Sequence, residues 1–330
     1  MRSPDVREAP PVGGASAPPW RVPTLVGPTA SGKTALSLRL AEVWEGEIIS
    51  MDSRQVYRGL DIGTDKVALA DRARAPHHGL DRVEPDERYS AGRFAREATA
   101  WIEDIVERGR QPVLVGGTGF FLRALTEPIF AEPPLDPLRR EQLRAWLAAR
   151  PLPELARWAD ALDPERAALA RAGGRQRVQR VLEVALLTGR ALSEWHQRSA
   201  GPPPRVRAWV VLLELPREEM DRRIDARVER MITGGLADEV RALRAQGYRR
   251  EHPGLTGTGY REMWDVLEGT RSLADAAAEM KRQTRQYARR QLTWFRNQLP
   301  DVAVRLEATR PLEDQVRVVV DHWEEERRAA

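Results

Sequence analysis

Eight consecutive residues near the start of the chain have the types and spacing of a phosphate-binding loop, glycine, four residues, then glycine, lysine and serine or threonine. They are Gly27, Pro28, Thr29, Ala30, Ser31, Gly32, Lys33 and Thr34. The glycines allow the backbone to turn its N–H groups toward an anion at a helix N-terminus. Lys33 adds a positive charge, and Thr34 places a hydroxyl where a phosphate-bound Mg²⁺ would sit. The loop predicts a phosphate or diphosphate ligand with Mg²⁺, without identifying the molecule that carries the phosphate.

The segments around this loop are those that a strand and a helix require. An apolar run over residues 24–26 leads into the loop, and a helical pattern follows it. Two other apolar runs, 47–50 and 112–115, end in polar residues, with Asp52 after the first and Thr118 after the second. Strands that alternate with helices are typical of a parallel α/β sheet, whose ligands gather at the carboxyl ends of the strands. We therefore expect Asp52, Thr118 and the loop to converge at one edge of the sheet.

Three roles suit a carboxylate in the position of Asp52. It could act as a general base above the phosphates, as a metal ligand in a kinase-like site, or as a helix cap. The residues alone do not separate these roles. The strand over residues 112–115 ends in Gly-Gly-Thr, not in the acid expected of a motor or signalling NTPase, which argues against that class of protein.

The distribution of strand and helix patterns predicts the domain organisation. Residues 1–19 are rich in Pro, Gly, Ala and charge and are predicted to form a disordered extension. Strand patterns stop over residues 122–204, where helical patterns punctuated by Pro and Gly replace them. We expect a P-loop NTPase-like parallel sheet core flanked by helices over 20–121 and 205–330, with a helical C-terminal part. An all-helical insertion domain over 122–204 would interrupt this core.

Composition excludes several classes of function. The 330 residues include no cysteine, so disulfides, thiol catalysis and cysteine-based metal sites are excluded. No apolar run approaches the roughly 20 residues that a membrane-spanning helix needs. The N-terminus lacks the apolar region of a signal peptide, and we expect a cytoplasmic protein. Residues 281–296 contain no acid and interleave arginines with aromatics, which suits either an RNA phosphate backbone or a solvated helix face.

A set of motifs gives the chain a resemblance to a known family. The phosphate-binding loop is followed, in order, by residues 52–64, 76–78, 89–91, 115–119, 176–183, 257–261 and 290–296. Taken together they resemble the tRNA dimethylallyltransferase (tRNA isopentenyltransferase) family over nearly everything from residue 22 to about residue 296. No zinc-finger spacing follows the basic helix, which favours the bacterial form.

The resemblance implies a reaction and roles for particular residues. A dimethylallyl group would pass from dimethylallyl diphosphate to N6 of the adenosine immediately 3′ of the tRNA anticodon, with Mg²⁺ as cofactor. The loop would hold the diphosphate, Thr34 would lie at the metal, and Asp52 would be the base. Thr118 and Arg140 resemble family residues that meet the substrate near the reacting centre. The resemblance also implies a set of tRNA-contact residues. They are Thr118, Arg140, Asp52, Ser53, Arg54, Gln55, Gln176, Arg177, Val178, Gln179, Arg180, Thr256, Gly257, Thr258, Gly259, Tyr260 and Arg261. The expected form is a monomer.

Several alternatives remain open at this point. The same donor could serve an adenylate isopentenyltransferase that uses a free nucleotide, and the same loop could serve a small-molecule kinase. Arg140 lies beside Arg139, so the register of that match rests on residues 135–137. Arg223 and Arg227, one helical turn apart, could reach the diphosphate or form salt bridges with nearby acids. The chain also has Asp65 where the family more often has a small residue.

Overall fold

The computed structural model describes residues 19–128, 133, 135–198, 203–299 and 301–329. The extension predicted over residues 1–19 therefore lies, apart from its last residue, outside the described residues. The chain divides into two compact units. One combines the residues up to 122 with those from 205 onward, and the other spans residues 123–204.

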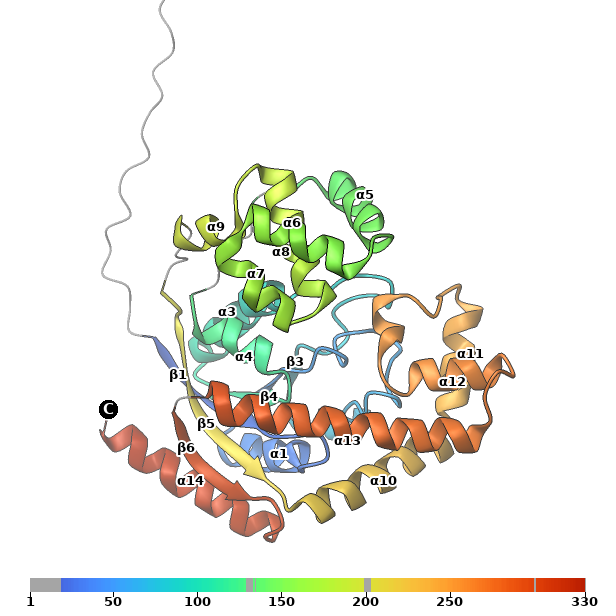
Figure 1. Ribbon diagram of the computed structural model, residues 1–330. Coiled ribbons are helices and arrows are strands. Elements are labelled where there is room, and N and C mark those ends of the chain that lie inside the picture. The colour runs from blue at the N-terminus through green and yellow to red at the C-terminus, as the bar shows by residue number, and fades with distance from the viewer. Residues whose placement is uncertain (1–18, 129–132, 134, 199–202, 300, 330) are drawn as a thin grey trace, which may run out of the picture. The chain divides into compact units, whose positions relative to one another are not determined.

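A single six-stranded sheet, parallel throughout, forms the centre of the first unit (Figure 1). The strand order is β3-β2-β4-β1-β5-β6. The strands are β1 (Trp20–Val26), β2 (Glu47–Ser50), β3 (His77–His78), β4 (Pro112–Gly116), β5 (Val206–Glu214) and β6 (Val302–Glu307). The predicted α/β parallel-sheet class is confirmed. The neighbouring strands β2, β4 and β1 are the ones followed by Asp52, Thr118 and the phosphate-binding loop, which explains why these residues share one edge.

Helices connect and flank these strands. They are α1 (Lys33–Val43), α2 (Leu69–Arg72), α3 (Ala91–Glu107), α4 (Gly119–Thr126), α10 (Arg217–Thr233), α11 (Leu236–Ala245), α12 (Tyr260–Leu267), α13 (Leu273–Gln298) and α14 (Leu312–Ala329), with a 3-10 turn at Pro253–Thr256. Side-chain caps begin two of them, since Ser90 accepts from Arg93 N–H at α3 and Ser272 from Asp275 N–H at α13. No helix in the described part of the chain has the length and apolar character needed to cross a bilayer.

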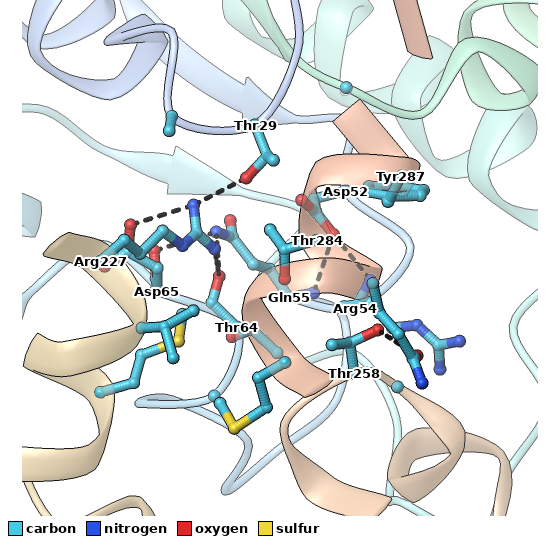
Figure 2. Close-up of a pocket in the computed structure, with 18 of the residues that line it drawn as sticks. Thr29, Asp52, Arg54, Gln55, Thr64, Asp65, Arg227, Thr258, Thr284 and Tyr287 are labelled. Atoms are coloured by element: carbon cyan, nitrogen blue, oxygen red, sulfur yellow. Dashed lines mark hydrogen bonds and ion pairs between the residues drawn. The ribbon is translucent and has the colours of Figure 1, made fainter. Parts of the chain in front are cut away.

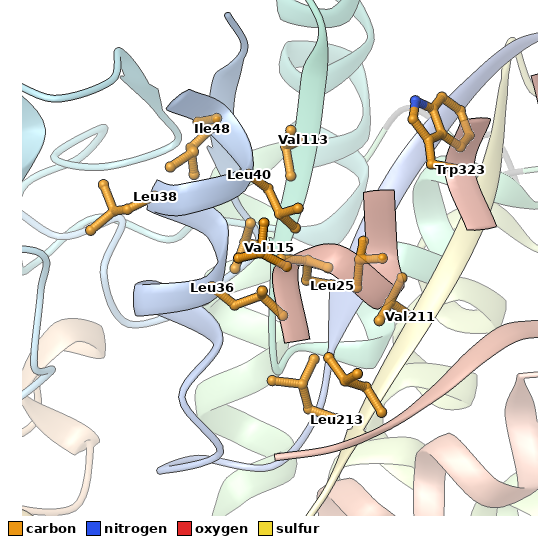
Figure 3. Close-up of a cluster of buried hydrophobic side chains, with 14 of the residues drawn as sticks. Leu25, Leu36, Leu38, Leu40, Ile48, Val113, Val115, Val211, Leu213 and Trp323 are labelled. Carbon is orange, nitrogen blue, oxygen red and sulfur yellow. The ribbon is translucent and has the colours of Figure 1, made fainter. Parts of the chain in front are cut away.

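The sheet is stabilised by an apolar core between β1, β4, β5 and the helices α1 and α14. Leu25, Leu36, Val113 and Val211 are fully buried there, and Figure 3 shows them converging from separate elements. Trp323 of α14 closes this core, with its ring centroid 5.1 Å from that of Trp209 on β5. Burial of such side chains supplies most of the driving force for folding. The result is a rigid platform under the loops at the carboxyl ends of the strands.

The second unit contains only helices among its described residues. They are α5 (Pro137–Ala148), α6 (Leu152–Leu162), α7 (Pro164–Ala172), α8 (Arg175–Thr188) and α9 (Leu192–Arg198). The unit has a hydrophobic core of its own, which includes the buried side chains of Leu147, Leu155 and Leu182. Buried Asp163 caps α7 by accepting from Arg166 N–H, and it also accepts from Ser193 N–H at 2.9 Å.

Candidate active site

The phosphate-binding loop is shaped by glycines where no other residue fits. Gly32 has a φ of +90°, in the left-handed region that L side chains avoid, and it precedes α1. At Gly27 a Cβ would lie only 2.9 Å from the carbonyl oxygen of Leu213 on β5. Between them the chain turns so that α1 begins at Lys33, directly after the loop that follows the carboxyl end of β1. This is the backbone geometry that anion-binding helix N-termini use.

Lys33 is held within this loop. Its Nζ donates to the carbonyl oxygens of Gly27 at 3.0 Å and Pro28 at 2.7 Å. Burial lowers the pKa of the Lys33 amine from 10.5 to about 7. The charge of Asp52 opposes this change and the charge of Arg227 adds to it. A desolvated lysine with a depressed pKa is typical of a site that awaits an anionic partner.

Asp52 follows β2 and is fixed through one of its two carboxylate oxygens. Oδ1 accepts hydrogen bonds from the backbone N–H groups of Arg54 at 2.8 Å and Gln55 at 3.4 Å. Thr118, after β4, holds the same turn because its hydroxyl accepts from the backbone N–H of Ser53 at 3.2 Å. Within the described residues, no hydrogen bond involves the second oxygen of Asp52. The carboxylate is therefore oriented by a capping arrangement while one oxygen faces the cavity.

Helix α13 adds two residues that the sequence analysis did not assign to the site. Tyr287 lies beside Asp52 (Figure 2), and burial, reinforced by the charge of Asp52, raises the pKa of its phenol to about 12. Gln291 is buried and bridges two loops. Its Nε2 donates to the Gly117 carbonyl oxygen at 2.9 Å, and its Oε1 accepts from Thr29 N–H at 2.9 Å. The acid-free pattern of the helix marked it as basic, but its spacing alone could not identify these contacts.

One cavity of about 880 Å³ brings most of the predicted residues together. Its lining includes Thr29 to Thr34 of the loop, Asp52 to Gln55, and residues 256–258 with Tyr260 and Arg261. Thr118 borders this region through Gly117 and Ser53. Tyr260 is almost fully buried, and its hydroxyl donates to Glu239 Oε1 at 2.6 Å. The buried Tyr260 side chain supports the wall of the cavity and is not presented to a large ligand.

Two arginines of α10 also line the cavity. Arg227 donates to the Thr29 hydroxyl at 3.0 Å, which places its guanidinium at the phosphate-binding loop. Arg223 pairs with Glu219 at 2.6 Å and donates to the Ala308 carbonyl oxygen at 3.2 Å. The salt-bridge alternative from the sequence analysis therefore holds, since Arg223 pairs with Glu219 and Arg227 with Asp65, while contact with a diphosphate stays a prediction.

The basic helix is compensated by acids on α10. Arg285 pairs with Asp225 at 2.5 Å, and Arg289 lies 3.7 Å from Asp221. Arg290 lines the cavity, has its guanidinium carbon 5.9 Å from the Tyr287 ring centroid, and has no ion pair among the described residues. The charge that α13 offers to an anion is thus smaller than its sequence suggests.

In the helical unit, three arginines surround one buried carboxylate. Glu183 of α8 accepts from Arg140 at 2.6 Å, Arg144 at 2.5 Å and Arg180 at 2.7 Å, and these neighbours lower its pKa although burial opposes them. The unit therefore presents more positive than negative charge at this point. The predicted contact residues Gln176, Arg177 and Gln179 lie on the same helix, α8, and are exposed or partly exposed. The side chain of Val178 is fully buried in the core of the unit, so a contact of this residue with RNA would have to use its backbone.

Fold and site together define a P-loop α/β protein with an anion-binding loop opposite a fixed carboxylate. The model of the IPP transferase family matches residues 55–298. The tRNA dimethylallyltransferase of Roseiflexus sp. (strain RS-1) is 46% identical over 305 residues, which cover 91% of this chain and 97% of that protein. The enzyme of the same name from Halorhodospira halophila is 46% identical over 298 residues, which cover 90% and 96%. The chain belongs to the IPP transferase, or tRNA dimethylallyltransferase, family.

Solved structures agree with this assignment. A tRNA isopentenylpyrophosphate transferase from Staphylococcus epidermidis superposes with a TM-score of 0.68 at 33% identity, covering 94% of this chain and all of that one. A eukaryotic dimethylallyltransferase described as acting on tRNA gives a TM-score of 0.74 at 30% identity, covering 87% and 74%. The family that the sequence motifs predicted is confirmed.

Proposed function

We propose that this protein transfers the dimethylallyl group of dimethylallyl diphosphate to N6 of the adenosine immediately 3′ of the tRNA anticodon. The observation that carries the proposal is the position of Asp52 in one cavity with the phosphate-binding loop. Relatives that match over nearly their whole length are named for this activity. We further propose that the protein works as a cytoplasmic monomer.

At the donor end, the loop would bind the diphosphate through its backbone N–H groups, with Lys33 and Arg227 contributing charge. Arg227 and Lys33 both lie at the loop, and among the described residues no carboxylate accepts a hydrogen bond from Lys33. These donors would stabilise the negative charge that develops on the leaving diphosphate. Because they are already in place, little reorganisation is needed during the reaction.

The residues also fit Mg²⁺ that arrives with the diphosphate. Thr34 is exposed at the cavity, and its hydroxyl makes no hydrogen bond within the described residues. No cluster of three or more acids and histidines suited to a metal occurs in the described part of the chain. Magnesium commonly keeps several waters and binds through substrate phosphates with few protein ligands, which suits Thr34 alone. When bound, the ion would neutralise charge on the leaving diphosphate.

At the acceptor end, Asp52 would accept the proton that N6 loses. The N6–C1 bond to the dimethylallyl group forms as the bond from C1 to the diphosphate oxygen breaks, and the proton moves from N6 to the carboxylate. The adenine amine is a weak nucleophile, so an oriented base assists the step. The hydrogen bonds to Oδ1 hold the carboxylate, which leaves its second oxygen for this proton. Thr118 and Tyr287 would keep the turn and the base in position.

The adenosine must leave the base stack to reach an enclosed cavity. Around the opening we propose that Ser53, Arg54, Gln55, Thr256, Gly257, Thr258, Gly259 and Arg261 contact the tRNA. The helical unit would contribute Gln176, Arg177, Gln179 and the cluster of Arg140 and Arg180 around Glu183. The three arginines around one carboxylate give this cluster an excess of positive charge, which suits the phosphates of an RNA backbone.

The test is incubation with unmodified tRNA, dimethylallyl diphosphate and Mg²⁺, followed by mass spectrometry of the nucleosides. Transfer to N6 of adenosine in tRNA is the expected result. Parallel reactions with AMP separate tRNA from a free nucleotide as acceptor. A γ-phosphate label that moved from ATP to an acceptor would instead indicate a kinase.

A further inference from the structure

Arg227 is held by three groups from two loops that face the cavity. Its guanidinium donates to the Thr29 hydroxyl at 3.0 Å and to the Thr64 carbonyl oxygen at 3.2 Å, and it lies 3.2 Å from the Asp65 carboxylate (Figure 2). The side chain of Arg227 is only 19% exposed, so water screens these contacts weakly. An arginine placed to meet a diphosphate is thus already paired with an anion.

The position of Asp65 is built into the fold. Its φ of +51° lies in the left-handed region, which residues with a side chain rarely adopt. The turn is fixed from two sides. The Gln55 amide donates to the carbonyl oxygens of Thr64 and Asp65 at 3.3 and 3.2 Å. Glu239 accepts from the backbone N–H groups of residues 61–63. A strained residue held this firmly at a cavity indicates a functional constraint.

We infer that Asp65 competes with the donor diphosphate for Arg227, which lowers the affinity for diphosphate and speeds its release. The inference rests on the proposed function, since it requires that a diphosphate bind the loop. An incoming diphosphate would accept hydrogen bonds from the guanidinium that Asp65 now occupies. When the diphosphate leaves, Asp65 recovers Arg227, so the vacant site retains a partner for its buried cation.

The experiment measures binding of magnesium pyrophosphate by isothermal titration calorimetry in the wild type and in Asp65→Asn. Asparagine keeps the size of the side chain and tolerates the left-handed backbone but carries no charge. We expect pyrophosphate to bind about two- to fivefold more tightly, from the strength of a partly exposed ion pair. The KM for dimethylallyl diphosphate should fall by the same factor, and the KM for tRNA should not change. The matched control is Asp238→Asn, which removes an exposed carboxylate that pairs with Arg241 on α11 and should leave both values unchanged.

A double-mutant cycle tests whether the effect passes through Arg227. In an Arg227→Gln background, Asp65→Asn should alter pyrophosphate affinity less than about twofold, because the pair no longer exists. Unchanged affinity in Asp65→Asn alone would overturn the inference. Weaker affinity would overturn it as well, since Asp65 would then hold Mg²⁺ or orient Arg227 for the ligand. Neither result would affect the proposed function, which fails only if the wild type transfers no dimethylallyl group to tRNA.

Discussion

The depressed pKa of Lys33 predicts that donor binding is linked to proton uptake. With a pKa of about 7, roughly half of the Lys33 amines are neutral at pH 7, and only about one in a hundred is charged at pH 9. A diphosphate beside the amine favours its charged form, so the bound state takes up the missing proton. Affinity should therefore fall about fivefold between pH 7 and 8 and about ninefold between pH 8 and 9. The terminal phosphate of the donor loses its own last proton at about pH 6, below the window from pH 7 to 9.

Calorimetry with an unreactive thio analogue of dimethylallyl diphosphate measures this linkage directly. Titrations at pH 8 in two buffers of different ionisation enthalpy should show close to one proton taken up for each ligand bound. The control is Lys33→Arg, because a guanidinium stays charged throughout and should abolish both the proton uptake and the pH slope. Unfolding takes up the same proton, so the stability of the ligand-free protein changes with pH in the opposite direction to the affinity. Between pH 7 and 9 the unfolded chain holds a proton that folded Lys33 has lost, so this residue makes the ligand-free protein more stable as the pH rises. A flat affinity with no proton uptake would refute the reasoning.

Four substitutions test other parts of the site. Asp52→Asn should leave both substrates bound and lower single-turnover transfer about 10²–10⁴-fold, as loss of a general base does; near-normal transfer by the folded variant would contradict the assignment. Arg290→Ala should weaken tRNA binding and reduce the slope of log affinity against log salt by about one unit, whereas Arg285→Ala should change it less because Arg285 is paired with Asp225. Gln291→Leu should raise the KM for the donor by removing hydrogen bonds to both loops, and a donor KM equal to that of the wild type would show that the loops hold their positions unaided.

The sequence predicts the centre of the fold better than its edges. Strands β1, β2 and β4 are buried apolar runs that lead into the phosphate-binding loop, Asp52 and Thr118, so their positions and their parallel arrangement follow from the pattern alone. Strand β6 was not predicted, because it lies at the edge of the sheet and alternates buried residues with exposed charged ones such as Arg305 and Glu307. Strand β3 consists of His77 and His78 only, which no apolar pattern marks. The hydrophobic pattern of an edge strand is weak because the strand has a neighbour on one side only and is less buried than a central strand.

The residues of the site likewise divide into those that the sequence predicts and those that it does not. The phosphate-binding loop, Asp52 and Thr118 are predictable because local motifs and the ends of adjacent strands determine where they lie. Tyr287 and Gln291 are not, since their roles depend on how α13 packs. The hydrogen bond between Gln291 and Thr29 joins residues 262 positions apart. The acids of α10 that neutralise part of the charge of α13 could not be predicted either, because the sequence of α13 alone does not show which helix packs against it.

Helix α13 connects the donor and acceptor ends of the site physically. Gln291 bonds to the phosphate-binding loop through Thr29 and to the turn before Thr118 through Gly117, and Tyr287 lies beside Asp52. Any displacement of the helix must either break these bonds or carry both loops with it, because a buried amide that loses its partners is costly. Since Arg290 lies on the same helix at the cavity, an RNA that engages it acts on the element that also shapes the donor loop. Binding of tRNA and of the donor should therefore be energetically coupled through α13, with Gln291 as the residue through which the coupling passes.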